Sequence, residues 1–209
     1  MDKEEDDRLI QEALDRKPSP YPKLLMPLDN DRNAHLSASV LNSASYIESY
    51  FLAAERLSKE AFLGPAAQEH EVVLPILFLY RHFTELSLKS CVSSLGWLIK
   101  KHVAAYGFKA PEHHRLLKLL KQLRSMHGDA EPYLKKLKLP SHQALGFIEE
   151  LAILDDESSK FRYLLVKDKQ ERAIGEDLYF NLDALDVGML HVREELKWYR
   201  DMVLETANG

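Results

Sequence analysis

Apolar residues recur every three or four positions along most of the chain, which is the spacing of one face of an α-helix. A long helix is expected over about 67–101, where apolar residues surround the helix almost completely and Pro75 either kinks it or marks its start. Such a helix belongs in the centre of a fold. Further helices are expected at about 34–57, 114–126, 141–154 and 182–204.

The expected helix at 114–126 is amphipathic, so its two faces can be assigned. Its leucines should face the core, namely Leu116, Leu117, Leu119, Leu120 and Leu123. Its basic residues should face solvent, namely Arg115, Lys118, Lys121 and Arg124. The next helix follows Pro140, and Ser141 is expected to cap its N-terminus.

Two parts of the chain lie outside this helical core pattern. Near 161–174, residues that favour strands precede a turn-like stretch, so a short extended hairpin is expected there. At the other end, an acidic helix at about 3–15 is expected to lead into a proline-rich arm. We therefore expect an acidic helix and arm over residues 1–45, and one all-α helical domain over residues 46–205.

The composition is that of an ordinary globular protein. The 209 residues are 45% hydrophobic and 29% charged. Cys91 is the only cysteine, which excludes an internal disulfide and a cysteine-based zinc site. The N-terminus is acidic, unlike a signal peptide, and the longest apolar run, around 74–80, is far shorter than the ~20 residues of a membrane span. We expect a soluble, cytoplasmic protein with no membrane contact.

Positive charge is concentrated in one stretch of an otherwise acidic chain. The net charge is −5, yet residues 97–138 hold ten Lys and Arg against three acidic residues. A basic sector of this kind suits phosphate groups, and it equally suits a solvated helical face matched by neighbouring acids. Both interpretations stay open at this point.

The central helix carries a group of charged and titratable residues within apolar surroundings. Arg81, Glu85 and Lys89 follow one another at i, i+4 spacing, and His82 lies three positions before Glu85, so all four can share one stripe. Charged side chains are rarely buried unless they are paired. These residues should therefore either neutralise one another as a structural network or line a functional pocket.

Two other polar clusters are able to meet this stripe. One is Glu112-His113-His114 at the head of the basic helix, and the other is the segment 155–163, in which Arg162 lies between two aromatic residues. Surface exposure and helix capping would explain the histidines equally well, and a structural pair with Asp155 or Asp156 would explain Arg162.

Several large enzyme classes are excluded by absent motifs. The Glu-x-x-His pairs of di-iron bundles and the His-Glu-x-x-His zinc motif are missing. The Gly-x-Ser-x-Gly elbow and the Gly-x-x-x-x-Gly-Lys-Ser/Thr phosphate loop are also missing. We expect neither a metal nor a cofactor.

Three ordered motifs carry a family resemblance. Tyr80-Arg81-His82-x-x-Glu85-Leu86-x-Leu88-Lys89, His114-x-Leu116 and Asp156-x-x-Ser159-x-Phe161-Arg162-Tyr163 resemble those of the bacterial HEPN-like helical proteins, over roughly residues 72–200. The resemblance implies a four- or five-helix up-and-down bundle, a homodimer, and a link to RNA or nucleotides in antiviral defence or stress. Many such proteins are metal-independent endoribonucleases, and others are binding or assembly modules.

The chain departs from the active ribonucleases of that family at one motif. Those enzymes carry an arginine followed four to six residues later by a histidine, and no arginine of this chain has that spacing. Three functions therefore stay open: a ribonuclease with a rearranged site, a non-catalytic binding or assembly module, and a sensor of nucleotides or small phosphates. The second would use the basic face or the N-terminal arm to contact a protein partner.

The enzyme hypothesis assigns roles to particular side chains. His82 or His114 would be the acid–base group, Arg81 and Arg162 would hold the phosphate, and Glu85 would orient the histidine. Further contacts to the substrate phosphate are expected from Lys89, Arg115, Lys118, Asp156, Ser159 and Tyr163.

Overall fold

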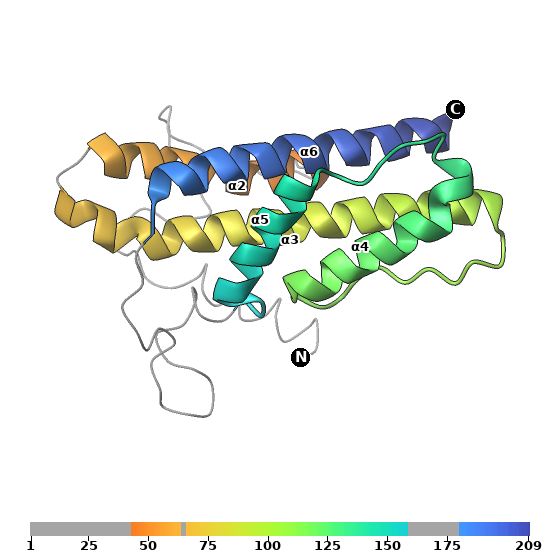
Figure 1. Cartoon of the computed structure of the whole chain (residues 1–209), viewed down its shortest axis with the longest axis horizontal. Coiled ribbons are helices and arrows are strands. Elements are labelled where there is room, and N and C mark those ends of the chain that lie inside the picture. The colour runs from red at the N-terminus through yellow and green to blue at the C-terminus, as the bar shows by residue number, and fades with distance from the viewer. Residues whose placement is uncertain (1–42, 64–65, 159–179) are drawn as a thin grey trace, which may run out of the picture. The chain divides into compact units, whose positions relative to one another are not determined.

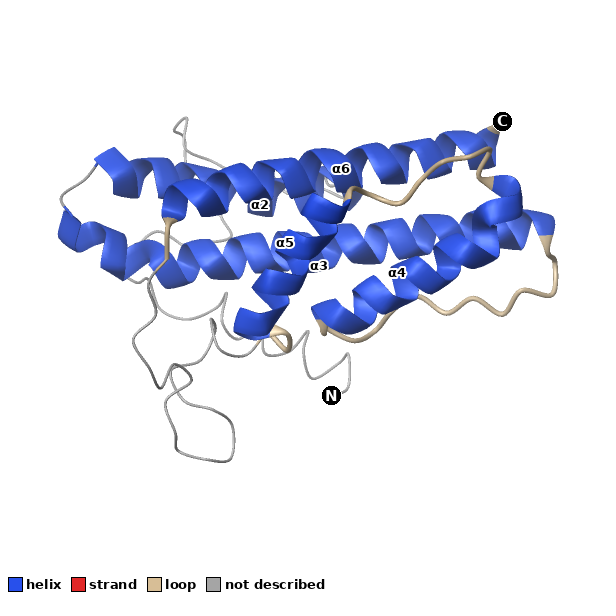
Figure 2. Ribbon diagram, viewed as in Figure 1, coloured by secondary structure: helices blue, strands red, loops and turns tan. Residues whose placement is uncertain are grey.

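The computed structural model describes residues 43–63, 66–158 and 180–209, and all regular elements in these ranges are helical (Figure 2). The elements are α2 (Ser43–Leu63), α3 (Ala66–His102), α4 (Leu116–Ala130), the short 3₁₀ helix η1 (Glu131–Tyr133), α5 (His142–Asp155) and α6 (Leu182–Asn208). The predicted all-α helical bundle is confirmed. The acidic helix, the proline-rich arm, the start of the first core helix and the hairpin near 161–174 lie outside the described residues.

Helix α3 lies at the centre of the unit formed by residues 42–209, because α2, α4 and α6 all pack against it. Its side chains are buried on several faces, including Ile76, Leu88 and Leu95. Pro75 lies inside the helix and does not end it. The interior of the bundle therefore surrounds α3, as its apolar sequence predicts.

The helices do not simply alternate in direction. Helix α2 packs beside α3 and is antiparallel to it. The extended segment 103–115 carries the chain back along α3, so that α4 runs in the same direction as α3 (Figure 1). Helix α5 crosses the bundle and packs on α4 and α6. The N-terminus of α4 is thereby brought beside the C-terminus of α5, where the chain joins them by a backbone hydrogen bond from Leu116 N to Asp156 O of 3.3 Å.

The ends of the helices are set by local side chains. Ser141 caps α5 as predicted, since its hydroxyl accepts a hydrogen bond from Ala144 N at 3.2 Å. Asn181 caps α6 in the same way through Ala184 N, at 3.0 Å. Helix α4 begins at Leu116, two residues later than predicted, because Arg115 adopts an extended backbone conformation.

One side-chain assignment on α4 was wrong. Leu116, Leu119, Leu120 and Leu123 are buried as expected, but Leu117 is exposed. The buried stripe of α4 continues through Met126 to Ala130, and Leu117 lies one residue, about 100°, round from Leu116. Leu117 therefore shares the outer face with the basic residues, which are exposed as predicted.

Helix α6 is tied to α2 and α3 by a shared carboxylate. Asp186 accepts hydrogen bonds from Ser58 Oγ and from Tyr80 Oη, both at 2.7 Å. Burial, and then the bond to Asp186, raises the pKa of Tyr80, so its hydroxyl remains a donor. The tyrosine of the first motif thus fixes the register of α6 against the central helix.

Two glycines allow close approach between elements. A Cβ atom at Gly96 on α3 would lie 2.5 Å from the ring of Phe108, so the glycine lets the segment 103–115 lie against the helix. A Cβ atom at Gly188 on α6 would lie 2.3 Å from the ring of Phe147 on α5.

Among the described helices, none has the length and apolar character needed to cross a bilayer.

Candidate functional site

Arg81 is a fully buried cation whose three guanidinium nitrogens all donate to groups of the chain. Its side chain is 0% exposed. Nε donates to the carbonyl of Asp155 at 3.1 Å, and Nη2 donates to the carbonyls of Asp156, at 2.9 Å, and His114. Nη1 forms an ion pair with Glu85. Arg81 was predicted to hold a phosphate, but its guanidinium is buried and its nitrogens donate to groups of the chain. In this structure Arg81 joins α3 to α4 and α5.

The acceptors of Arg81 lie where helix ends need partners. The last carbonyls of a helix receive no hydrogen bond from an N–H of the same helix, and buried carbonyls need a donor from elsewhere. Arg81 supplies donors to the C-terminus of α5 at Asp155 and Asp156. The carboxylate of Asp156 in turn accepts from Leu117 N at 2.9 Å, which caps α4 from another part of the chain. Arg81 and Asp156 therefore fix the meeting point of three helices.

Glu85 is the common acceptor at the centre of this network. Its carboxylate is 1% exposed and accepts from Arg81 Nη1, from Lys89 Nζ at 2.8 Å and from His114 Nδ1 at 2.7 Å. Burial alone would raise the pKa of Glu85, but the hydrogen bonds from Lys89, Arg81 and His114 together lower it. The carboxylate is therefore ionised near neutral pH, and it holds the His114 ring by Nδ1.

Two residues of the network are buried and two reach solvent. The His114 side chain is 59% exposed and that of Lys89 is 20% exposed, in contrast to Arg81 and Glu85. Because Nδ1 of His114 faces Glu85, the other ring nitrogen, Nε2, is left for a ligand. An exposed imidazole oriented by a buried carboxylate is a common acid–base arrangement.

His113 adds a second imidazole beside this edge. Burial is the main cause that lowers the pKa of His113, and the positive charges of Lys118 and Lys89 lower it further. Its Nδ1 atom is buried and has no hydrogen-bond partner within the described part of the chain. We call His113, His114, Lys89 and Lys118 the rim. It combines two lysine ammonium groups with two imidazoles.

His82 does not join the stripe in which it was predicted. Its ring packs edge-on against Tyr50 of α2, with 4.5 Å between centroids, and stacks on Phe78 at 5.8 Å. The hydrogen bonds of Glu85 come instead from Arg81, Lys89 and His114. The reason is helical geometry, since adjacent residues are about 100° apart and His82 therefore turns toward α2 while Arg81 turns toward α4 and α5.

The remaining predicted site residues fall into two groups. Arg115 is exposed and pairs with Glu157, and Lys118 is exposed on α4. Arg162, Ser159 and Tyr163 lie outside the described residues, so their assigned roles stay predictions. The predicted residues that the structure brings together are Arg81, Glu85, Lys89, His114 and Asp156. In the described ranges, no three His, Cys, Asp or Glu side chains converge as metal ligands.

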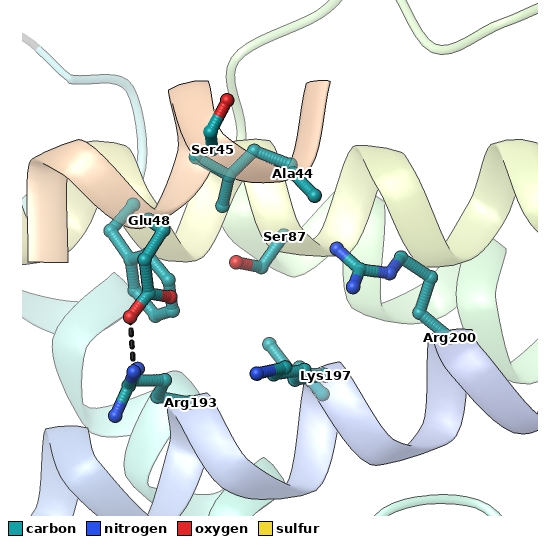
Figure 3. A pocket seen from close by; sticks show the side chains of 10 residues that line it. Ala44, Ser45, Glu48, Ser87, Arg193, Lys197 and Arg200 are labelled. Atoms are coloured by element: carbon teal, nitrogen blue, oxygen red, sulfur yellow. Dashed lines mark hydrogen bonds and ion pairs between the residues drawn. The ribbon is translucent and has the colours of Figure 1, made fainter. Parts of the chain in front are cut away.

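A second polar site was not predicted from the sequence. A cavity of about 320 Å³ lies between α2, α3 and α6, and Arg193, Lys197 and Arg200 of α6 line it (Figure 3). These cations are spaced i, i+4 and i+7, which places them on one helical face. That spacing was the available signal, but α6 also carries many acidic residues that mask it in a charge count.

Comparison with known proteins finds no match: no protein-family model, no curated protein and no solved structure matches this chain. The resemblance to the HEPN-like proteins therefore stays a prediction.

Proposed function

We propose that the chain cleaves RNA without a metal ion, at the rim centred on His114. The observation that carries the proposal is the 2.7 Å contact between Nδ1 of His114 and Oε1 of Glu85, made by an exposed imidazole and a buried carboxylate. A structural salt bridge needs only Arg81 and Lys89 to neutralise Glu85. The added, exposed histidine is what a purely structural network would not require.

The chemistry follows from the residues of the rim. One base takes the proton of the ribose 2′-hydroxyl, the 2′-oxygen attacks the adjacent phosphorus, and the bond to the 5′-oxygen breaks as that oxygen receives a proton. His113, whose lowered pKa keeps it neutral near pH 7, serves as the base. His114 acts in its imidazolium form, in which Nδ1–H donates to Glu85 and Nε2–H gives its proton to the 5′-oxygen. Lys89 and Lys118 stabilise the charge on the phosphorane. Arg81 acts here as a positioning residue that holds Glu85.

The test measures cleavage of a panel of labelled RNAs by the full chain in the presence of EDTA. We expect His114→Gln to reduce the cleavage rate by about 10²–10⁴, the usual contribution of one general acid. His142→Gln is the matched control, because His142 is an exposed histidine on α5, away from Glu85. If the wild-type chain leaves every RNA intact, or if both variants cleave equally well, the proposal fails.

A second candidate is a non-catalytic binding or assembly module. It is favoured by the saturation of Arg81 with internal acceptors and by the lack of an arginine–histidine pair at the family spacing. In that case His114→Gln lowers the thermal stability of the chain, and nucleotides that bind without turnover raise it. A homodimer and a role in bacterial defence or stress are implied by the resemblance alone and belong to both candidates.

A further inference from the structure

The cavity between α2, α3 and α6 has one cationic wall and one apolar wall. Arg193, Lys197 and Arg200 of α6 extend toward it, while Ser45 of α2 and Ser87 of α3 lie across from them (Figure 3). Apolar contacts come from residues such as Ile47, Phe83 and Leu196. Its volume of about 320 Å³ is of the size that takes a small molecule.

The charges around the cavity do not cancel. Arg193 pairs with Glu48, and Arg200 donates from Nη2 to Asp201 at 2.6 Å. Lys197 forms no hydrogen bond or ion pair within the described part of the chain. No acidic side chain described there pairs with its positive charge. Glu48 is the only acidic residue among those that line the cavity, against three cations.

Two details indicate that an anion is the missing partner. The Nε atom of Arg193 is buried and has no partner in the described ranges, although its guanidinium is held over the ring of Phe51 at 4.7 Å. The first turn of α2 contributes Ala44 and Ser45 to the cavity and contains no acidic residue. No acidic side chain of this turn therefore opposes the charge of the α6 cations.

The cavity is separate from the rim. Phe83 and Ser87 on α3 line the cavity, and Arg81 and Glu85 belong to the network under the rim. Positions two apart on a helix point about 200° away from each other, so the two sites use opposite faces of α3.

We propose that this cavity binds a small phosphomonoester. An anionic phosphate pairs with Lys197, and the guanidinium groups of Arg193 and Arg200 and the hydroxyl of Ser87 lie around the same cavity as further donors. The apolar wall receives the organic part of the molecule. The volume suits a small molecule, and the cavity lies on the face of α3 opposite the rim, so this ligand is distinct from the RNA substrate proposed for the rim.

The test is calorimetric titration of the full chain with ribose 5-phosphate, and with ribose as the unphosphorylated control. We expect 1:1 binding of ribose 5-phosphate and no heat from ribose. Lys197→Glu should weaken binding at least tenfold, whereas Lys197→Arg should retain it. Lys197 is exposed, so the substitution leaves the packing intact. Lys100→Glu, at an exposed position on α3 outside the cavity, is the matched control and should bind normally.

The outcomes separate this proposal from the one for the rim. His114→Gln should bind ribose 5-phosphate as the wild type does, even if RNA cleavage is lost or was never present. The proposal is overturned if ribose 5-phosphate does not bind at millimolar concentration, if ribose binds equally, or if Lys197→Glu and Lys100→Glu behave alike.

Discussion

The Nη2 atom of Arg81 lies 2.9 Å from the carbonyl oxygen of Asp156, at the point where α5 ends and α4 begins. The same residue, Asp156, accepts from Leu117 N through its carboxylate. Arg81 of α3 thus donates to the last carbonyls of α5, and the carboxylate of Asp156 accepts from a backbone N–H in the first turn of α4. The packing of α4 and α5 against α3 depends on this pair as well as on apolar burial.

Removal of the Arg81 guanidinium should destabilise the fold strongly. Arg81→Met leaves Glu85 without its buried partner and removes the arginine donors to the carbonyls of Asp155 and Asp156. Breaking a buried ion pair in this way costs about 3–5 kcal/mol, measured as the free energy of urea unfolding. The control is Arg124→Met, which breaks an exposed pair with Glu149 and should cost about 0–1 kcal/mol. Equal losses in the two variants would contradict the structural role of Arg81.

Glu85 should make stability depend on pH in the acid range. Its hydrogen bonds lower its pKa in the folded state below the ordinary 4.5, despite the opposing effect of burial. The stabilisation is therefore present above about pH 4.5 and is lost as the pH falls through the folded-state pKa. Unfolding free energies between about pH 6 and pH 3 should fall less steeply for Glu85→Gln than for the wild type. Glu150→Gln, at an exposed site on α5, should keep the wild-type slope.

His113 should titrate below the ordinary histidine value. Burial disfavours its charged form, and the charges of Lys118 and Lys89 add to this effect. Its imidazole resonances, followed by NMR as a function of pH, should therefore show a midpoint below 6.5. Lys118→Gln removes one of the repelling charges and should move the midpoint upward. A midpoint at or above 6.5 in the wild type would remove His113 from the proposed role of base.

Gly188 should tolerate no larger residue. A Cβ atom there would lie 2.3 Å from the Phe147 ring, so Gly188→Ala must push α5 and α6 apart or displace the ring. Overpacking of this kind costs about 1–3 kcal/mol, visible in chemical unfolding. Gly146→Ala is the matched control, because no atom lies within 4 Å of its added Cβ, and it should stabilise its helix by about 0.5–1 kcal/mol. Adding Phe147→Leu to Gly188→Ala should recover part of the loss.

The helices could be predicted from the sequence because apolar positions recur with helical spacing in each of them. The apolar positions from Ile76 to Ile99 indicated the central helix, and Ser141 indicated the start of α5 by a purely local signal. The start of α4 was misplaced because its cap comes from Asp156, far along the chain. Leu117 was misassigned because a cluster of leucines hides which of them lies at the edge of the stripe.

The sequence predicted the contacts of the site that lie within one helix, and it left those between helices open. The contacts of Glu85 with Arg81 and Lys89 follow from i, i+4 spacing within one helix. The contact with His114 required the long return of the segment 103–115, which no local rule specifies. The main acceptors of Arg81 are backbone carbonyls, which carry no signature in the side-chain sequence. The cavity cations on α6 were overlooked because a pocket depends on how three helices diverge, not on any one of them.

The joint at Arg81 also sets how the protein opens. One guanidinium holds both the last turn of α5 and the residue before Arg115 to α3, and Asp156 joins these two segments by accepting from Leu116 N and Leu117 N. Native-state hydrogen exchange should therefore show the first turn of α4 and the final turn of α5 opening together, as a single cooperative unit. Opening of this unit would also carry the His114 backbone away from Glu85, so large movements of the rim are coupled to the joint at Arg81.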